Sequence, residues 1–185
     1  LAVDADATYV KIKLTGTGCK LILAKELLDS AIPEDEDYQV LDELKGESLV
    51  GTEYEPLYRF TVPDKKAWYA VSADFVTLLD GTGIVHLAPA FGEDDMNASL
   101  EHDLPVVQLV DEEGRFTHEV TPWKGMFVKE ADPLIIEELE SRGRLYRSQQ
   151  YAHTYPFCWR CDTPLLYYAR TSWFVKTTAV KDALL

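Results

Sequence analysis

Hydrophobic and polar positions alternate in two stretches near the start of the chain, residues 8–14 and residues 20–23. Alternation with a period of two is typical of β-strands, and the Gly-Thr-Gly between the two stretches allows a tight reversal. We therefore predict a β-hairpin at this place. Residues 67–76 alternate in the same way and predict a further strand, which leads into a glycine-rich turn at Gly81.

Helix signals are fewer. The best-marked helix has Asp132 as its N-cap, Pro133 at its first position and Gly143 just after its end. A second predicted helix opens at the acidic residues around Asp95 and ends before Pro105. Many short strands with few helices predict a mainly β fold, barrel-like and closed or partly open, with peripheral α-helices.

The most informative stretch is residues 81–95, Gly-Thr-Gly-Ile-Val-His-Leu-Ala-Pro-Ala-Phe-Gly-Glu-Asp-Asp. Its glycines permit a tight turn, and its short apolar run predicts that His86 lies on a strand. Asp95 falls near a helix N-terminus, after a loop short enough for both side chains to line one pocket. Taken alone, His86 is more often a packed core residue, and Asp95 more often a carboxylate that stabilises the first helical turn.

Composition bounds the class of protein. The chain has 185 residues, of which 46% are hydrophobic, and this is enough for one domain with a buried core. Its formal net charge of −14 argues against nucleic-acid binding, because phosphate contacts need clustered lysine and arginine. Without an apolar run of membrane-spanning length or a secretory leader, we expect no membrane association. The odd number of cysteines, three, favours a reducing, cytoplasmic location.

Two of the cysteines, Cys158 and Cys161, form a Cys-x-x-Cys pair. Such a pair supplies two thiolates to one metal ion, whereas structural zinc takes four ligands. His153 is near in sequence but offers only a third ligand. The pair alone therefore predicts half of a zinc site.

Three segments carry a family resemblance. They are residues 81–95, residues 155–161 (Tyr-Pro-Phe-Cys-Trp-Arg-Cys) and residues 167–174 (Tyr-Tyr-Ala-Arg-Thr-Ser-Trp-Phe). The first resembles the signature of the editing domain that is inserted into class I aminoacyl-tRNA synthetases of the isoleucyl family. The other two resemble the segment by which that insertion returns to the catalytic domain. The related valyl and leucyl families usually lack a histidine in place of His86. The resemblance implies a barrel-like editing domain over residues 1–157, without the family's threonine-rich strand, which is expected upstream of Leu1. Residues 158–185 would then return toward a catalytic domain.

The resemblance also implies a reaction, hydrolysis of the ester of mischarged valyl-tRNA(Ile) while isoleucine is excluded. Asp95 corresponds to the family's anchor for the substrate ammonium group, and a charge-assisted hydrogen bond suits that role. His86 corresponds to a residue that narrows the side-chain pocket. Further substrate-binding positions are Gly83, Ala88, Phe91 and Tyr155. No catalytic triad or nucleophilic serine is apparent in the sequence, so we expect direct attack by a positioned water.

The same resemblance implies the partners. They are the 3′ end of tRNA(Ile), the valine moiety that it carries, and the catalytic domain of the same polypeptide. We expect no cofactor for this chain itself. In the longer protein, Cys158 and Cys161 would share zinc with a second cysteine pair, and the catalytic domain would use ATP and Mg²⁺. Two alternatives stay open, the editing domain of a valyl or leucyl enzyme and a noncatalytic binding β-domain.

Overall fold

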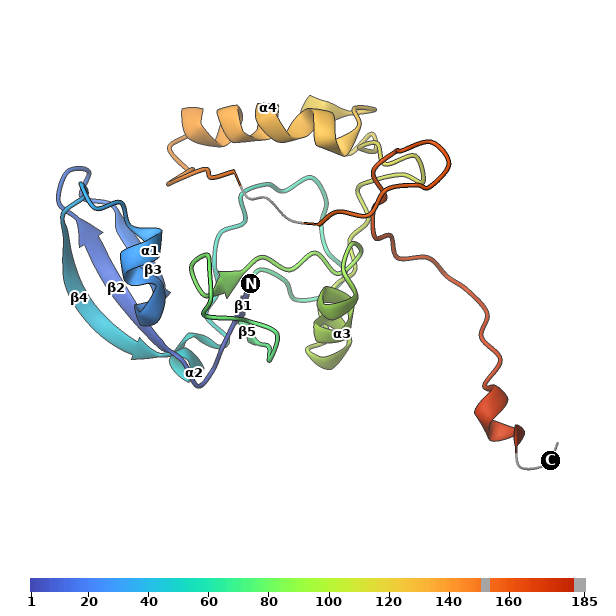
Figure 1. Ribbon diagram of the computed structural model, residues 1–185, viewed down its shortest axis with the longest axis horizontal. Helices are drawn as coiled ribbons and strands as arrows, with labels where there is room; N and C mark the ends of the chain where they lie inside the picture. The colour runs from blue at the N-terminus through green and yellow to red at the C-terminus, as the bar shows by residue number, and fades with distance from the viewer. Residues whose placement is uncertain (151–153, 182–185) are drawn as a thin grey trace.

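Two three-stranded sheets organise the chain in the computed structural model, which describes residues 1–150 and 154–181 (Figure 1). The larger sheet is antiparallel with the strand order β3-β2-β4, formed by β2 (Thr8–Leu14), β3 (Lys20–Ala24) and β4 (Tyr38–Lys45). The smaller sheet has the order β5-β1-β6, formed by β1 (Ala2–Val3), β5 (Val71–Ser72) and β6 (Ile84–Val85). Strand β1 pairs in parallel with β5 and antiparallel with β6.

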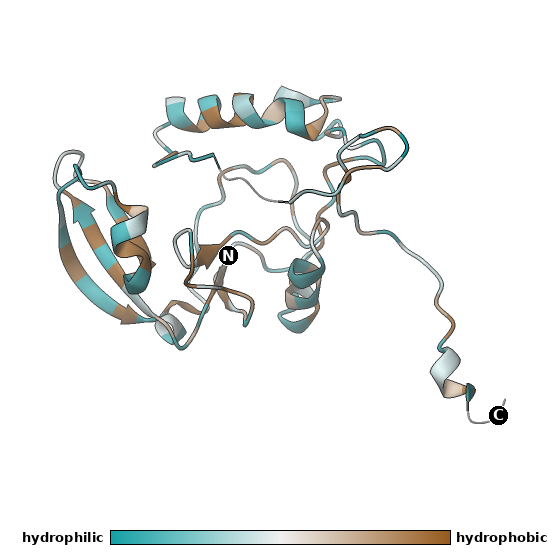
Figure 2. Cartoon of the chain, in the orientation of Figure 1, coloured by the Kyte–Doolittle hydropathy of each residue, from teal (hydrophilic) through white to brown (hydrophobic). Residues whose placement is uncertain are grey.

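The hairpin predicted near the start of the chain is confirmed. Strands β2 and β3 pair from Tyr9 opposite Ala24 to Lys13 opposite Lys20. The alternation is visible as bands along the sheet in Figure 2. One face of β2 is buried beneath the 3₁₀ turn η1 (Lys25–Leu27) and the short helix α1 (Leu28–Ala31), and its core is formed by Val10, Ile12, Leu14, Leu23 and Ile32.

The strand predicted over residues 67–76 is wrong except at Val71–Ser72. Trp68 has a φ of 62°, in the left-handed region that bulky residues avoid, and this interrupts any extended strand. The Trp68 carbonyl instead accepts a hydrogen bond from the amide of Tyr54 at 2.8 Å, and the guanidinium of Arg59 lies 4.9 Å from the Trp68 ring centroid. The alternation therefore did not correspond to a strand over most of this segment.

The described residues form no closed barrel. Strands β1, β5 and β6 have two residues each, too few to continue the sheet around a barrel. Residues 54–69 and 105–117 contribute only isolated bridges, such as Val110 opposite Phe116. Prolines at positions 56, 63 and 105 remove backbone donors from these segments, and this explains why they do not extend a ladder.

The helices surround the sheets. They are α2 (Gly46–Leu49), α3 (Glu93–Glu101), α4 (Val128–Ser141) and the 3₁₀ turns η2 (Thr121–Trp123) and η3 (Thr177–Ala179). Among the described residues, no helix combines the length and the apolar character that crossing a membrane requires.

Helix α4 begins earlier than predicted. It starts at Val128 after Phe127, so Pro133 lies inside the helix and Asp132 is not its N-cap. Ala131, in the first turns of the helix, is fully buried and packs with Val120 and Trp123. This contact stabilises the helical residues that precede Pro133. The predicted end is confirmed, because Gly143 has a φ of 64° and the Arg144 amide donates to the Leu139 carbonyl at 2.8 Å.

A polar cluster ties the end of α4 to residues 57–58. The Tyr58 hydroxyl donates to Glu138 Oε2 at 2.6 Å, and Arg142 Nε lies 3.1 Å from Glu138 Oε1. Arg142 also donates to the Leu57 carbonyl at 2.9 Å. Burial, followed by the hydrogen bond to Glu138, raises the pKa of Tyr58 to about 12.

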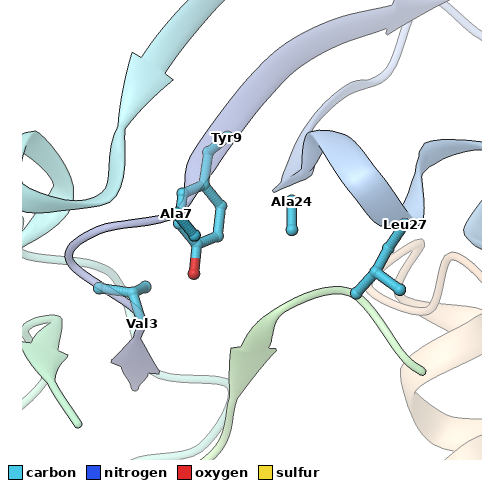
Figure 3. Packing of buried hydrophobic residues seen from close by; sticks show 5 residues of the cluster. All are labelled: Val3, Ala7, Tyr9, Ala24 and Leu27. Carbon is cyan, nitrogen blue, oxygen red and sulfur yellow. The ribbon is translucent and has the colours of Figure 1, made fainter. Parts of the chain in front are cut away.

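One buried hydrogen bond joins the larger sheet to the turn before β6. Tyr9 is fully buried, and its hydroxyl donates to the Gly83 carbonyl at 2.6 Å. In Figure 3 this hydroxyl points out of β2 toward the strand β6. Gly83 has a φ of 71°, and a Cβ added there would lie 2.5 Å from the Ala24 Cβ. Only glycine therefore fits this turn without displacing the sheet.

We predict that Gly83→Ala destabilises the fold more than Gly81→Ala. Both glycines have a positive φ, but nothing lies within 4 Å of a Cβ at Gly81. The left-handed backbone costs about 1–2 kcal/mol at either position. At Gly83 the overlap with Ala24 adds about 1–3 kcal/mol. The free energies of unfolding, measured by urea titration, check this prediction, and equal losses in the two variants would contradict it.

A second prediction concerns pH. Because the pKa of Tyr58 is raised to about 12, its contribution to stability is complete below the usual tyrosine pKa of about 10 and is lost as the pH rises toward 12. The free energy of unfolding of Tyr58→Phe should therefore fall less steeply over this range than that of the parent. Glu138→Gln should move the Tyr58 pKa back toward 10 in a spectrophotometric titration. Identical pH slopes for Tyr58→Phe and the parent would refute the assignment.

Candidate functional site

The segment between β6 and α3 builds the candidate site. Its start is fixed to the larger sheet by the Tyr9 hydrogen bond to Gly83 and by the Ala24 amide, which donates to the Thr82 carbonyl at 2.8 Å. Its end is the first turn of α3, whose N-cap is Gly92. Residues 86–92 run between these two anchors without regular structure and are called the site loop below.

His86 is the first residue of the site loop and follows β6 directly. It is exposed, and it also borders the large cavity described below. Burial of the ring lowers the pKa of His86, against the opposing effect of Asp95. The imidazole is therefore neutral at neutral pH, because its ordinary pKa is already about 6.5.

A cavity of about 810 Å³ opens beside the site loop. One wall is aromatic, with Tyr58 stacked on Phe60 at 5.2 Å between ring centroids and set edge-on against Trp123 at 5.5 Å. Helix α4 adds Ile135 and Leu139. The site loop contributes the opposite lining: His86, Leu87, Ala88, Pro89 and Phe91.

Asp95 holds the site loop from the helix side. It is the third residue of α3 and half-buried, and its Oδ1 accepts a hydrogen bond from the Ala88 amide at 2.9 Å. Its other oxygen, Oδ2, lies close to Gly92: a Cβ added at Gly92 would be only 1.9 Å from Oδ2. Asp95 does not itself line the large cavity, but it is bonded to Ala88, which does.

The structure thus brings three of the predicted site residues to one cavity, His86, Ala88 and Phe91, with Asp95 one hydrogen bond behind them. Gly83 is elsewhere, since it is buried against Ala24 and supports the loop from below.

Tyr155 also lies outside the cavity lining. Its ring meets Phe157 edge-on at 5.8 Å between centroids, and Lys129 Nζ lies 5.4 Å from its ring centroid. Any role for Tyr155 at the substrate stays a prediction.

Several lining residues were not predicted, among them Tyr54, Tyr58, Phe60 and Trp123. Their signal is weak but present, because Tyr54, Tyr58 and Phe60 have even spacing and so share one side of an extended segment. Tyr168 was also missed as a site contact. Its ring meets Phe91 edge-on at 6.2 Å, and the two residues are 77 positions apart in the sequence, a separation that no local pattern connects.

Cys158 and Cys161 lie on one reverse turn. The Cys158 amide donates to the Thr163 carbonyl and the Asp162 amide to the Cys158 carbonyl, both at 2.9 Å. Hydrogen bonds with Thr163, and less with Cys158, lower the pKa of the Cys161 thiol.

Half of a zinc site at this cysteine pair stays a prediction. Within residues 1–150 and 154–181, no group of three or more potential ligands is placed to hold a metal. His153 lies outside these residues.

Sequence comparison gives close relatives over the whole chain. The chain is 56% identical over 185 residues to the isoleucine–tRNA ligase of Clostridium novyi (strain NT) and 54% identical over 184 residues to that of Clostridium acetobutylicum. It is 47% identical over 188 residues to the isoleucine–tRNA ligase of Bdellovibrio bacteriovorus. All of this chain is covered in each case, and it spans only 17% or 18% of the relatives' length. No protein-family model matches the chain.

Structure comparison gives the fold. The crystal structure of GlLeuRS-CP1 matches with a TM-score of 0.60 and 11% sequence identity, over 80% of this chain and 77% of that chain. The fold is therefore that of a synthetase CP1 editing domain. Together with the full-length similarity to part of the isoleucine–tRNA ligases, this places the chain in the isoleucyl-tRNA synthetase family, as its CP1 editing-domain part.

Proposed function

We propose that this chain is the part of an isoleucyl-tRNA synthetase that hydrolyses valyl-tRNA(Ile) and rejects isoleucyl-tRNA(Ile). The observation that carries the proposal is the convergence of His86, Ala88 and Phe91 on one cavity, with Asp95 bonded to Ala88. The relatives' shared name, isoleucine–tRNA ligase, supports the choice of amino acid and tRNA. We infer that the longer protein ligates isoleucine to tRNA(Ile) with ATP in a separate catalytic domain.

The reaction needs a second selection step because the first is weak. One missing methylene in an apolar pocket changes binding by only about 10- to 200-fold, a range for which isoleucyl-tRNA synthetases are themselves a standard example. A hydrolytic site that admits valine and excludes isoleucine supplies the remaining discrimination. His86 suits the excluding role, since its ring borders the cavity beside the apolar Leu87 and Ala88.

Asp95 suits the role of anchor for the substrate. An aminoacyl ester carries a free ammonium group, and a carboxylate binds it by a charge-assisted hydrogen bond. Oδ1 of Asp95 is engaged with the Ala88 amide at 2.9 Å, so the ammonium would be bound through Oδ2. The neutral state of His86 supports this arrangement, because an imidazolium beside the pocket would repel the ammonium.

The chemical step is attack of a water on the ester carbonyl. The bond between the carbonyl carbon and the ribose oxygen breaks, the ribose oxygen takes up a proton, and valine and tRNA are released. The enzyme's contribution in this proposal is positioning, because holding ester and water in reach replaces a bimolecular encounter. A threonine-rich strand ahead of Leu1, as implied by the family resemblance, would complete the binding site in the longer protein.

We predict that Asp95→Ala, in the synthetase that carries this chain, slows deacylation of valyl-tRNA(Ile) by about 10- to 100-fold. A hydrogen bond to a charged group contributes about 1.5–3 kcal/mol, and each 1.4 kcal/mol is a factor of ten. Asp94→Ala is the matched control, since Asp94 is exposed in the same first helical turn. Asp95→Asn separates the two roles, because its amide oxygen can still accept from Ala88. Full activity in Asp95→Asn would rule out the ammonium anchor.

We predict that His86→Ala admits isoleucine. Removing the ring should raise the rate of hydrolysis of isoleucyl-tRNA(Ile) by about tenfold or more, while hydrolysis of valyl-tRNA(Ile) changes less. His118→Ala is the control, because His118 is exposed and does not line the cavity. The measurement is release of labelled amino acid from purified aminoacyl-tRNA. If isoleucyl-tRNA stays intact with His86→Ala, His86 is not the excluding residue.

A further inference from the structure

A segment distant in sequence crosses the site loop. The Ala169 amide donates to the Ala90 carbonyl at 2.8 Å. The neighbouring Tyr168 sets its ring edge against Phe91, with 6.2 Å between centroids, and its hydroxyl donates to the Val110 carbonyl at 3.1 Å. We call residues 166–170 the strap.

The strap is itself held firmly. A Cβ added to Gly114 would lie 3.0 Å from Leu166 Cδ1, so Leu166 packs closely over the reverse turn that contains Gly114. At its other end, Arg170 NH2 lies 3.7 Å from Glu112 Oε1. Together with the Tyr168 bond to Val110, these contacts fix the strap to residues 110–114 rather than to the site loop alone.

The site loop has few bonds of its own. Its third residue, Ala88, is bonded to Asp95, and its last residue, Gly92, accepts the helix bond from the Met96 amide at 2.9 Å. Between them, the Phe91 amide donates to the Ala88 carbonyl at 2.8 Å. The middle of the loop, at Ala90 and Phe91, is therefore held against the body by the strap.

We propose that Tyr168 is a positioning residue for the site loop, which it holds by its ring contact with Phe91 while its hydroxyl fixes the strap to Val110. The proposal rests on the function proposed above, and it extends that site to a residue that touches no reacting atom. Displacing the middle of the loop would move Ala88. This would change the position of the substrate ester relative to Asp95 and the cavity wall. A small displacement at a reacting centre costs rate more than binding.

Tyr167 provides a matched control. It adjoins Tyr168 but is 67% exposed and has no hydrogen bond in the described part of the chain. Tyr167→Leu therefore changes the same residue type in the same segment without touching Phe91 or Val110. Tyr168→Phe is the conservative variant, because it keeps the ring edge against Phe91 and loses only the hydroxyl.

The experiment uses the longer synthetase and compares deacylation of valyl-tRNA(Ile) by the three variants. Tyr168→Leu should lower kcat about tenfold with KM changed less than about twofold, since phosphate contacts set most of the affinity for tRNA. Tyr168→Phe should recover most of the kcat, and Tyr167→Leu should match the parent. Equal kcat values for Tyr168→Leu and Tyr167→Leu, or a loss in KM alone, would overturn the proposal.

A second measurement does not depend on activity. Amide hydrogen exchange in peptides that cover residues 88–92 should be several-fold faster in Tyr168→Leu than in Tyr167→Leu, with β2 unchanged in both. Unchanged exchange at residues 88–92 would overturn the positioning role. If the parent synthetase does not deacylate valyl-tRNA(Ile), the proposed function fails, whereas the exchange result still decides whether Tyr168 holds the loop.

Discussion

The hydrogen bond from the buried Tyr9 hydroxyl to the Gly83 carbonyl, at 2.6 Å, is the constraint on which the site depends. It joins the hairpin sheet to the turn that starts the site loop, next to the Ala24 amide bond to the Thr82 carbonyl and the packing of Ile84 on the same core. A buried carbonyl without a partner costs about 1–3 kcal/mol, so the turn and the sheet are stable only together. The hydroxyl also accepts a hydrogen bond from the Asp4 amide at 3.0 Å. The segment between β1 and β2 is therefore bonded to the same tyrosine. The position of His86, three residues beyond Gly83, therefore follows from how β2 folds.

The site loop illustrates how hydrogen bonds fix the conformation of a segment that has no regular secondary structure. Each backbone group that no ladder satisfies needs another partner. Here the partners come from three directions: Asp95 bonds Ala88 from the helix, Ala169 bonds Ala90 from the strap, and the loop bonds itself at Phe91. The cavity on the other side is apolar and aromatic, so it offers shape but few polar contacts. A cavity of this kind can select a ligand by size, and the Asp95 carboxylate holds the loop that lines it.

Local patterns predicted what depends on neighbouring residues. The β2–β3 hairpin follows from alternation and a Gly-Thr-Gly turn, and the end of α4 follows from Gly143. The strand predicted around Trp68 is wrong because Trp68 has a left-handed backbone, which the hydrophobic pattern does not reveal. The predicted start of α4 is wrong because burial of Ala131 outweighed the preference of Pro133 for the first turn of a helix. In the site, the resemblance pointed to His86 and Asp95, but the contact from Tyr168 joins distant residues and needed coordinates.

The net charge of −14 bears on how Asp95 can act. Three acidic residues open α3, and at a helix N-terminus the backbone dipole stabilises each of them. Only Asp95 turns its carboxylate toward the loop, and one of its oxygens is already engaged by the Ala88 amide. Gly92 leaves room for the other oxygen, since a Cβ there would lie 1.9 Å from Oδ2. The glycine is thus needed for a steric reason rather than for its backbone angles, which are extended, with φ at −152°. Asp95 therefore bonds the Ala88 amide through one oxygen while Gly92 leaves room for the other, and this holds the site loop from the helix side.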